Sequence, residues 1–238
     1  MRNLHRVIDE SALGGPLPEQ GNGSHHAPFA EVEGDDIVET VAPTHKDPVQ
    51  NALVYALRET FGVDNNVWDD GIEKTAARVI RYWQEFTAHP TPIDIKDVQF
   101  DFPFTAFPAH SNQLVTCCDI EFASLCAHHL LPFYGLAHIG YVPHKLQVGL
   151  SKLPRLVDFW ARRPQVQEKL TEQIASSLKD KIDAMGVAVV IEARHTCMAC
   201  RGVRKHTGIM RTSNMKGVFL TAPAARSEFL TMIGRPSL

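Results

Sequence analysis

The sequence predicts an α+β domain in which two helices pack on one face of an antiparallel sheet. Three observations support this class. Residues 47–95 have helical periodicity, residues 97–148 change to a period of two with β-forming side chains, and two helical stretches then precede a last group of strands. Strands that are grouped before and after a pair of helices, rather than alternating with them, favour antiparallel pairing with the helices on one face.

The first 46 residues read as a disordered N-terminal tail. Gly14-Gly15-Pro16 and Gly21-Asn22-Gly23-Ser24 interrupt any periodicity, and large apolar side chains are few. Such a segment buries too little surface to offset the entropy of ordering it. We therefore expect a helical segment over residues 47–95 and a catalytic domain over residues 96–238, and we interpret His25-His26 as a solvated pair in the tail.

Two helices are predicted in the segment 47–95. Asp47 can cap the first, with Pro48 at its first position, and Gly62 ends it. Its apolar side chains recur at helical spacing (Val49, Leu53, Leu57, Phe61). Asp70 can cap the second helix, which His89-Pro90-Thr91-Pro92 ends. Its apolar stripe is broader (Ile72, Ala76, Val79, Ile80, Trp83, Phe86).

The catalytic domain begins with short strands. Phe100, Phe102 and Phe104 alternate, and residues 114–116, 120–122 and 134–142 have strand character. A short helix is expected over 153–161, followed by a long helix with apolar residues four apart and a C-cap at Gly186 (Val166, Leu170, Ile174, Leu178, Ile182). A strand over 187–194, further short strands to Leu220 and a terminal helix over 222–233 complete the prediction.

Composition excludes several classes of protein. The chain has 238 residues, 44% of them hydrophobic and 21% charged, which is typical of a globular protein. A net charge of −3 argues against wholesale nucleic-acid binding. No apolar run reaches the ~20 residues that span a bilayer. The five cysteines cluster rather than forming a disulfide framework, and the N-terminus lacks the apolar run of a signal peptide, so we expect cytoplasmic residence.

Two segments combine the side chains that zinc prefers. Cys126-Ala127-His128-His129 supplies a thiol and imidazoles, and His195-Thr196-Cys197 supplies another of each. Three protein ligands and one open position distinguish catalytic from structural zinc, so we expect zinc-activated attack of water on a small molecule. Spacing alone leaves the ligands undecided, because Cys197 and Cys200 also have a zinc-like spacing. If the strand continues through Cys197, His195 and Cys197 share one of its faces.

Basic side chains indicate a possible phosphate site. Lys152 and Arg155 follow Ser151 at a helix start, and Arg201, Arg204 and Lys205 follow the cysteines. Such cations can hold a polyphosphate, although the same pattern also occurs on a solvated face. Glu168 lies in the first turn of the long helix, where a glutamate is normally explained by the helix dipole alone.

Four blocks of this chain resemble GTP cyclohydrolase I, in the order and near the spacing of that family. The resemblance covers about residues 47–235 and excludes the tail. The blocks are Cys126-Ala127-His128-His129-Leu130-Leu131-Pro132-Phe133, Gly149-Leu150-Ser151-Lys152-Leu153, Arg162-Arg163-Pro164-Gln165-Val166-Gln167-Glu168-Lys169-Leu170-Thr171 and Cys197-Met198-Ala199-Cys200-Arg201-Gly202-Val203.

The resemblance implies a tunnelling fold (T-fold), in which sheets from five subunits form a β-barrel and two pentamers stack into a homodecamer with active sites at subunit interfaces. It also implies zinc-dependent conversion of GTP to 7,8-dihydroneopterin triphosphate with release of formate, a first step of pterin, folate or deazapurine synthesis. GTP is then the substrate, and neither nucleic acid nor a membrane is a partner.

The resemblance also assigns roles to individual residues. It implies one zinc ion per subunit, held by Cys126, His129 and Cys197. Catalytic roles fall to His195 as general acid and base, to His128 near the metal and to Ser151 near the ribose. Gln167 and Glu168 match residues that contact guanine. Lys152, Arg155 and Arg201 match contacts to the triphosphate. Arg78 stands where the family supplies an arginine from a neighbouring subunit, and Arg81, a further implied substrate contact, stands where a lysine is often found.

The chain departs from the family pattern in places. Ala127 stands where glutamate is common, Ala76 replaces a proline, and residues 209–213 contain fewer threonines. Two other functions therefore stay open. One is another zinc-dependent nucleobase hydrolase such as a deaminase, although none of the twelve histidines is followed two positions later by glutamate. The other is a non-catalytic T-fold protein that binds purines or pterins.

Overall fold

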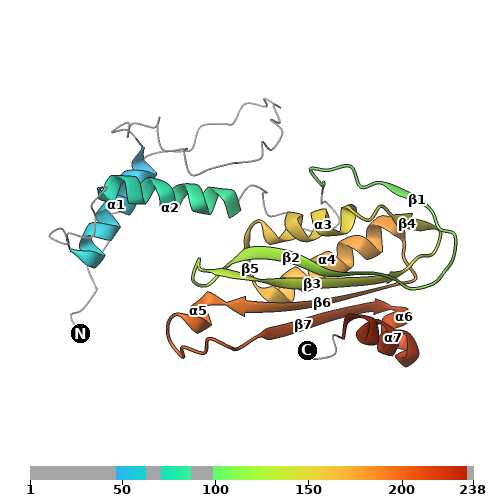
Figure 1. Cartoon of the computed structure of the whole chain (residues 1–238). Coiled ribbons are helices and arrows are strands. Elements are labelled where there is room, and N and C mark those ends of the chain that lie inside the picture. Colours follow the sequence, from blue (N-terminus) through green and yellow to red (C-terminus); the bar gives the residue numbers. More distant parts are fainter. Residues whose placement is uncertain (1–46, 63–70, 87–98, 235–238) are drawn as a thin grey trace. The chain divides into compact units, whose positions relative to one another are not determined.

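The computed structural model describes residues 47–62, 71–86 and 99–234, and the expected tail lies outside them. Figure 1 shows the elements of the chain. In chain order they are α1 (Pro48–Phe61), α2 (Ile72–Phe86), β1 (Ala106–Pro108), β2 (Val115–Cys126), β3 (Pro132–Val142), β4 (Leu146–Val148), α3 (Lys152–Ala161), β5 (Pro164–Gln165), α4 (Gln167–Ile182), β6 (Gly186–His195), α5 (Thr196–Ala199), β7 (Met210–Gly217), α6 (Val218–Thr221) and α7 (Pro223–Ile233).

The two N-terminal helices form where the sequence predicts them. The Asp47 carboxylate caps α1 by accepting from the backbone N–H groups of Val49 at 2.9 Å and Gln50 at 3.4 Å. Gly62 ends the helix with a φ of 81°. Gln50 Nε2 donates to the Glu73 carbonyl oxygen of α2 at 3.1 Å, which ties the helices together. The predicted cap at Asp70 and stop at residues 89–92 lie outside the described residues.

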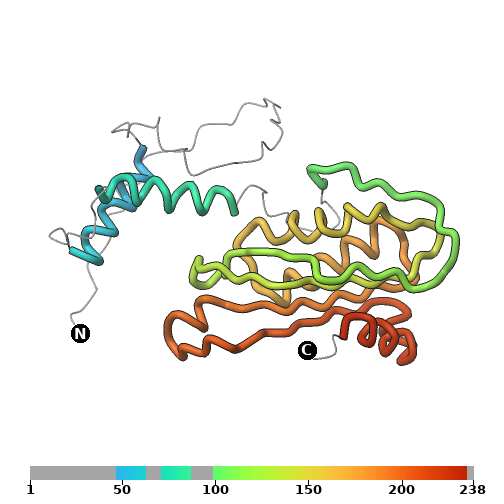
Figure 2. The backbone as a smooth tube through the Cα atoms, in the orientation of Figure 1, coloured from blue at the N-terminus to red at the C-terminus, as the bar shows by residue number. Residues whose placement is uncertain are grey.

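A five-stranded sheet forms the centre of the larger domain, in the order β5-β2-β3-β6-β7. Neighbours from β2 to β7 pair antiparallel, and β5 pairs parallel with the end of β2. Figure 2 shows β6 and β7 side by side, as their register requires. Residues 115–116 and 120–122 belong to one strand, β2, which begins at Val115 and is interrupted by a bulge between Cys117 and Ile120.

Helices α3 and α4 cover one face of this sheet, which confirms the α+β class (Figure 1). Side chains that alternate along β6 divide between two clusters. Val187, Val189 and Ile191 face the helices in the main core, whereas Ala188 and Val190 pack with Phe219 and Phe229 of α6 and α7. The terminal helices therefore pack against the opposite face of the sheet, which the sequence did not indicate.

Two local predictions were wrong. Phe100, Phe102 and Phe104 are not in a strand; their rings stack, with centroids of Phe100 and Phe102 5.1 Å apart, because this packing covers the edge of the core near Phe159. The long helix ends at Asp183 and not at Gly186. Asp183 adopts the left-handed conformation at the C-cap, which aspartate tolerates, and Gly186 becomes the first residue of β6.

Within the part of the chain that the structure describes, no helix is long and apolar enough to cross a membrane.

Gly135 permits the close approach of β3 and β6 near the end of both strands. A Cβ atom at this position would lie 1.9 Å from the Glu192 carbonyl oxygen. We expect Gly135→Ala to lower the unfolding free energy by at least ~1–3 kcal/mol, because the backbone itself must move. Thermal unfolding measures this. Gly149→Ala is the control, since its nearest atom would be at 3.8 Å. Equal melting temperatures for the two variants would contradict the predicted clash.

Candidate metal centre

A tight turn after β2 brings Cys126 and His129 together. The Cys126 N–H donates to the Leu131 carbonyl at 2.8 Å, and the N–H groups of His129 and Leu130 donate to the Cys126 carbonyl. Leu130 has a φ of 51°, which reverses the chain. This folding places His129 Nδ1 3.5 Å from Cys126 Sγ. The Cys126 side chain is buried at the end of the strand, whereas His129 is exposed.

Cys197 approaches the same point from a short helix. The condition for His195 and Cys197 to share one strand face is not met, because β6 ends at His195 and α5 begins at Thr196. Thr196 Oγ1 donates to the Pro132 carbonyl oxygen of β3 at 2.7 Å, and its own carbonyl accepts from the Cys200 N–H at 2.8 Å. These bonds turn the backbone away from the strand direction and bring Cys197 Sγ within 4.0 Å of Cys126 Sγ.

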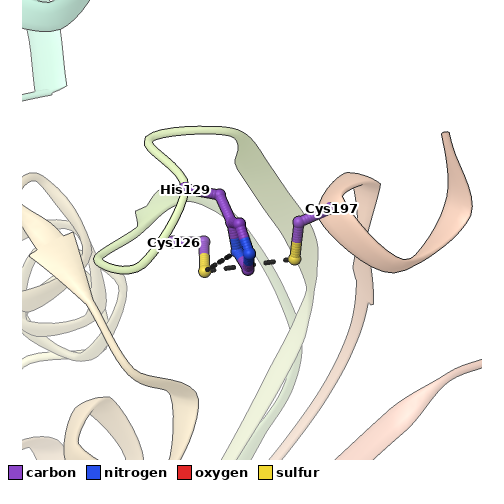
Figure 3. Close-up of side chains that lie close together, drawn as sticks. All are labelled: Cys126, His129 and Cys197. Carbon is purple, nitrogen blue, oxygen red and sulfur yellow. Dashed lines mark hydrogen bonds between the residues drawn. The ribbon is translucent and has the colours of Figure 1, made fainter. Parts of the chain in front are cut away.

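The three side chains converge as a metal-binding group (Figure 3). Their ligand atoms all lie within 4.8 Å of one another. In a tetrahedral zinc site, bond lengths of about 2.3 Å to sulfur and about 2.0 Å to nitrogen separate two sulfurs by about 3.8 Å and sulfur from nitrogen by about 3.5 Å. The observed separations of 4.0 Å between the Cys126 and Cys197 sulfurs and 3.5 Å between Cys126 Sγ and His129 Nδ1 are close to these values.

Two alternative ligands are outside this group. His128 Nδ1 lies 3.8 Å from Cys126 Sγ, yet His128 is not among the residues whose ligand atoms all lie close to one another. Cys200 is exposed, and its thiol donates to the Thr196 carbonyl oxygen at 2.8 Å. The geometry thus separates candidates that spacing alone left open.

Burial, Cys126 and Arg201 set the electrostatics around Cys197. Burial raises the pKa of the Cys197 thiol above its ordinary value, and the adjacent Cys126 thiol raises it further. Arg201 acts on this pKa in the opposite direction, so its positive charge lies close enough to be felt at the site. A bound cation would instead lower the pKa of the Cys197 thiol, because thiols bind metals as thiolates.

His195 is oriented by the strand next to it. Its cross-strand partner is Phe133 of β3, and the two rings stack with centroids 4.5 Å apart and planes 3° from parallel. His195 Nε2 lies 2.8 Å from Gln167 Oε1. Burial lowers the pKa of His195, and the negative charge of Glu168 partly offsets this. A half-buried imidazole that stays largely neutral can both accept and release a proton near neutral pH.

The first turn of α4 brings Gln167 and Glu168 to the same region in different environments. Gln167 is 1% exposed and its amide contacts only groups of this chain, whereas Glu168 is exposed. The adjacent carboxylate is therefore available to a ligand in a way that the Gln167 amide is not.

The remaining predicted substrate contacts lie on three other segments. Ser151 is the N-cap residue of α3 and makes no side-chain capping bond, Lys152 and Arg155 follow it, and Arg201 lies in the loop after α5. Arg78 and Arg81 are exposed on α2. Arg201 is linked electrostatically to the metal-binding group, since its charge lowers the pKa of Cys197.

Sequence reasoning missed the residues that hold the site in shape. Phe133 stacks on His195, Thr196 anchors α5, and the Gln165 carbonyl of β5 accepts from the Ala127 N–H at 2.9 Å. Phe133 and Gln165 stand in motifs of the sequence, but strand register decides what they touch, and register is not visible in one sequence.

Comparison with known proteins places the chain in a family. The sequence model of the GTP cyclohydrolase I family matches residues 53–234. GTP cyclohydrolase 1 of Campylobacter jejuni (strain RM1221) is 48% identical over 180 residues, covering 76% of this chain and 92% of that protein. GTP cyclohydrolase 1 of Leptospira biflexa serovar Patoc is 43% identical over 181 residues, covering 76% of this chain and 96% of that protein.

A solved structure, the archaeosine synthase QueF-Like in the apo form, has 14% sequence identity and a TM-score of 0.37 and covers 44% of this chain and 93% of its own. The family assignment rests on the extent of the family match and on the identity to these two relatives, and not on this structural likeness. The chain belongs to the GTP cyclohydrolase I family.

Proposed function

We propose that this GTP cyclohydrolase holds one zinc ion per subunit with Cys126, His129 and Cys197, and opens the imidazole ring of GTP. Formate and 7,8-dihydroneopterin triphosphate are the products. The convergence of two thiols and an imidazole beside His195 supports the proposal most directly. When bound there, zinc would supply Lewis-acid activation of water for attack on the ring carbon between the two imidazole nitrogens.

His195 moves the protons of the reaction. As the ring opens, the nitrogen that leaves the attacked carbon needs a proton, and hydrolysis of the resulting formamide needs one to be taken up and returned. An imidazole suits both tasks because its pKa lies near the working pH. The stacking on Phe133 holds the ring plane in one orientation while it does so. His128, next to the metal ligands, and Ser151, at the start of α3, are the further proposed catalytic groups.

Glu168 selects guanine. The N1–H and exocyclic amino groups of guanine are adjacent donors, and one carboxylate can accept from both. Adenine lacks this pair of donors, so binding it would leave the carboxylate without the two hydrogen bonds that guanine supplies. Lys152, Arg155 and Arg201 bind the triphosphate, Arg78 completes the site from a neighbouring subunit, and Arg81 is a further substrate contact.

Replacing Glu168 tests base selection. We expect Glu168→Ala to raise the Kd for GTP by at least roughly 100-fold, since the variant loses two charge-assisted hydrogen bonds that contribute ~1.5–3 kcal/mol each. Zinc content should not change. Calorimetric titration with GTP and metal analysis measure the two quantities, with Asp180→Ala, an exposed acid near the other end of α4, as the control. Unchanged affinity for GTP would contradict the role of Glu168.

We also propose that subunits join through the edges of their sheets, as in a homodecamer of two pentamers. In the described part of the chain, β7 has a strand neighbour on one side only, and β5 pairs with β2 only at Leu125 and Cys126. Such edges expose unpaired backbone groups that another strand can satisfy. Native mass spectrometry of the full chain tests this: ten subunits are expected, and a monomer at working concentration would contradict it.

The reaction itself distinguishes the proposed function from the alternatives. Incubation of the zinc-loaded protein with GTP should release one formate per pterin formed. An enzymatic assay measures the formate, and fluorescence measures the pterin. Release of ammonia without formate would indicate a deaminase. Binding of GTP without turnover would indicate a non-catalytic T-fold protein, for which Ala127 in place of the usual glutamate is the supporting observation.

A further inference from the structure

Gln167 has all of its side-chain polar atoms engaged inside the fold. Its Nε2 lies 3.1 Å from the Ile191 carbonyl oxygen, 3.1 Å from the Met210 carbonyl oxygen and 3.1 Å from Thr212 Oγ1. Its Oε1 lies 2.8 Å from His195 Nε2. At 1% exposure the amide is a buried link between α4, β6 and β7.

These partners determine which way the amide points. The carbonyl oxygens of Ile191 and Met210 can only accept hydrogen bonds, so the NH₂ group of Gln167 must face them. Rotating the amide by 180° would place Oε1 against two carbonyl oxygens, and the hydrogen-bond network excludes that arrangement. Thr171 supports the same arrangement. Its hydroxyl donates to the backbone carbonyl oxygen of Gln167 at 2.7 Å and lies 2.6 Å from Thr212 Oγ1, the third partner of the Gln167 NH₂ group.

The orientation of the Gln167 amide in turn determines which tautomer the neutral His195 ring adopts. Gln167 Oε1 has no hydrogen to donate, so His195 Nε2 must carry the proton of their 2.8 Å bond. Neutral imidazole has one N–H, which leaves the lone pair on Nδ1. Two backbone carbonyls thus decide, through one amide, which ring nitrogen of His195 can accept a proton.

We propose that Gln167 is a positioning residue that holds neutral His195 in its Nε2–H tautomer, so that Nδ1 is the nitrogen that exchanges protons with the substrate. This inference rests on the proposed function, in which His195 transfers the protons. It differs from the guanine contact that the family resemblance implies for Gln167. For such a contact, a buried amide would have to give up its bonds to β6 and β7, whereas exposed Glu168 needs no such change.

The tautomer can be measured directly in the unaltered protein. The ¹⁵N NMR shifts of a histidine ring distinguish a protonated nitrogen from one with a lone pair. In the zinc-loaded protein labelled with ¹⁵N-histidine, the signals that disappear in His195→Ala should report a protonated Nε2 and an unprotonated Nδ1. A protonated Nδ1 in neutral His195 would overturn the proposal, and this result does not depend on any Gln167 variant folding.

Gln167→Met then tests the effect on catalysis, because methionine has nearly the same length but no acceptor for the His195 N–H. We expect kcat for formate release to fall roughly 10- to 100-fold, as misplacement of a catalytic group does. The KM for GTP and the zinc content should stay within about two- to threefold. The His195 signals should show both tautomers.

Gln173→Met provides a matched control on the same helix. Gln173 is also buried, and its Oε1 accepts from Gln165 Nε2 at 2.8 Å rather than from His195. This variant should lose stability comparably while kcat stays within about twofold. Equal losses of kcat in both variants would show that Gln167 acts only through packing and would contradict its positioning role. A raised KM with unchanged kcat in Gln167→Met would favour contact with guanine.

The outcomes separate this inference from the function on which it rests. If wild-type protein releases no formate from GTP, the proposed function fails, whatever the tautomer. If wild-type protein turns over GTP and Gln167→Met does so at the same rate, the positioning role alone fails.

Discussion

Cys197→Ser is expected to lose bound metal and GTP turnover together. Serine keeps the size of the side chain but replaces a soft thiolate ligand with a hydroxyl, which zinc binds poorly in proteins. Even residues that only support metal ligands typically contribute ~10- to 100-fold to metal affinity or activity, so loss of a ligand should reduce turnover by more than about 100-fold. Elemental analysis and formate release measure the two effects on one preparation.

Cys200→Ser is the matched control for this substitution. Cys200 lies three residues from Cys197, but it is exposed and donates to the Thr196 carbonyl oxygen, a bond that serine can also make. We expect full zinc content and activity. A Cys197→Ser protein that retains stoichiometric zinc would show that the ligand set is wrong, and loss of zinc in Cys200→Ser instead would assign the site to the alternative thiol.

His195→Ala is expected to keep zinc and lose catalysis. No atom of His195 belongs to the metal-binding group, so its removal leaves all three ligands in place. General acid and base catalysis typically contributes ~10²–10⁴-fold, and we expect kcat for formate release to fall within that range. Separate assays of formate and pterin fluorescence show which step is slowed.

His206→Ala controls for the loss of a nearby imidazole. His206 accepts from Arg194 Nη1 through its backbone carbonyl, so removal of its side chain preserves that bond. We expect its kcat to match the wild type. Turnover at the wild-type rate in His195→Ala would remove His195 from the mechanism, and loss of zinc from this variant would show a structural role instead.

The chain's local signals predicted most elements and the ligand types of the site. Asp47-Pro48 and Gly62 mark the ends of α1, since capping and backbone freedom are properties of single residues. The Cys126-x2-His129 spacing placed two donors on one turn. One prediction that failed depended on neighbours distant in sequence: the alternating Phe100, Phe102 and Phe104 pack as rings on the core edge rather than pairing in a strand.

By itself, the sequence determined the α+β class, the metal-binding residue types and the family resemblance, because periodicity and short motifs depend on residues close together in the chain. Only the tertiary structure decided that α5 rather than a strand presents Cys197 and that Gln167 contacts His195. Each of these depends on how β3, β6 and β7 align and on which backbone carbonyls then need a donor, and a single sequence does not encode that register locally.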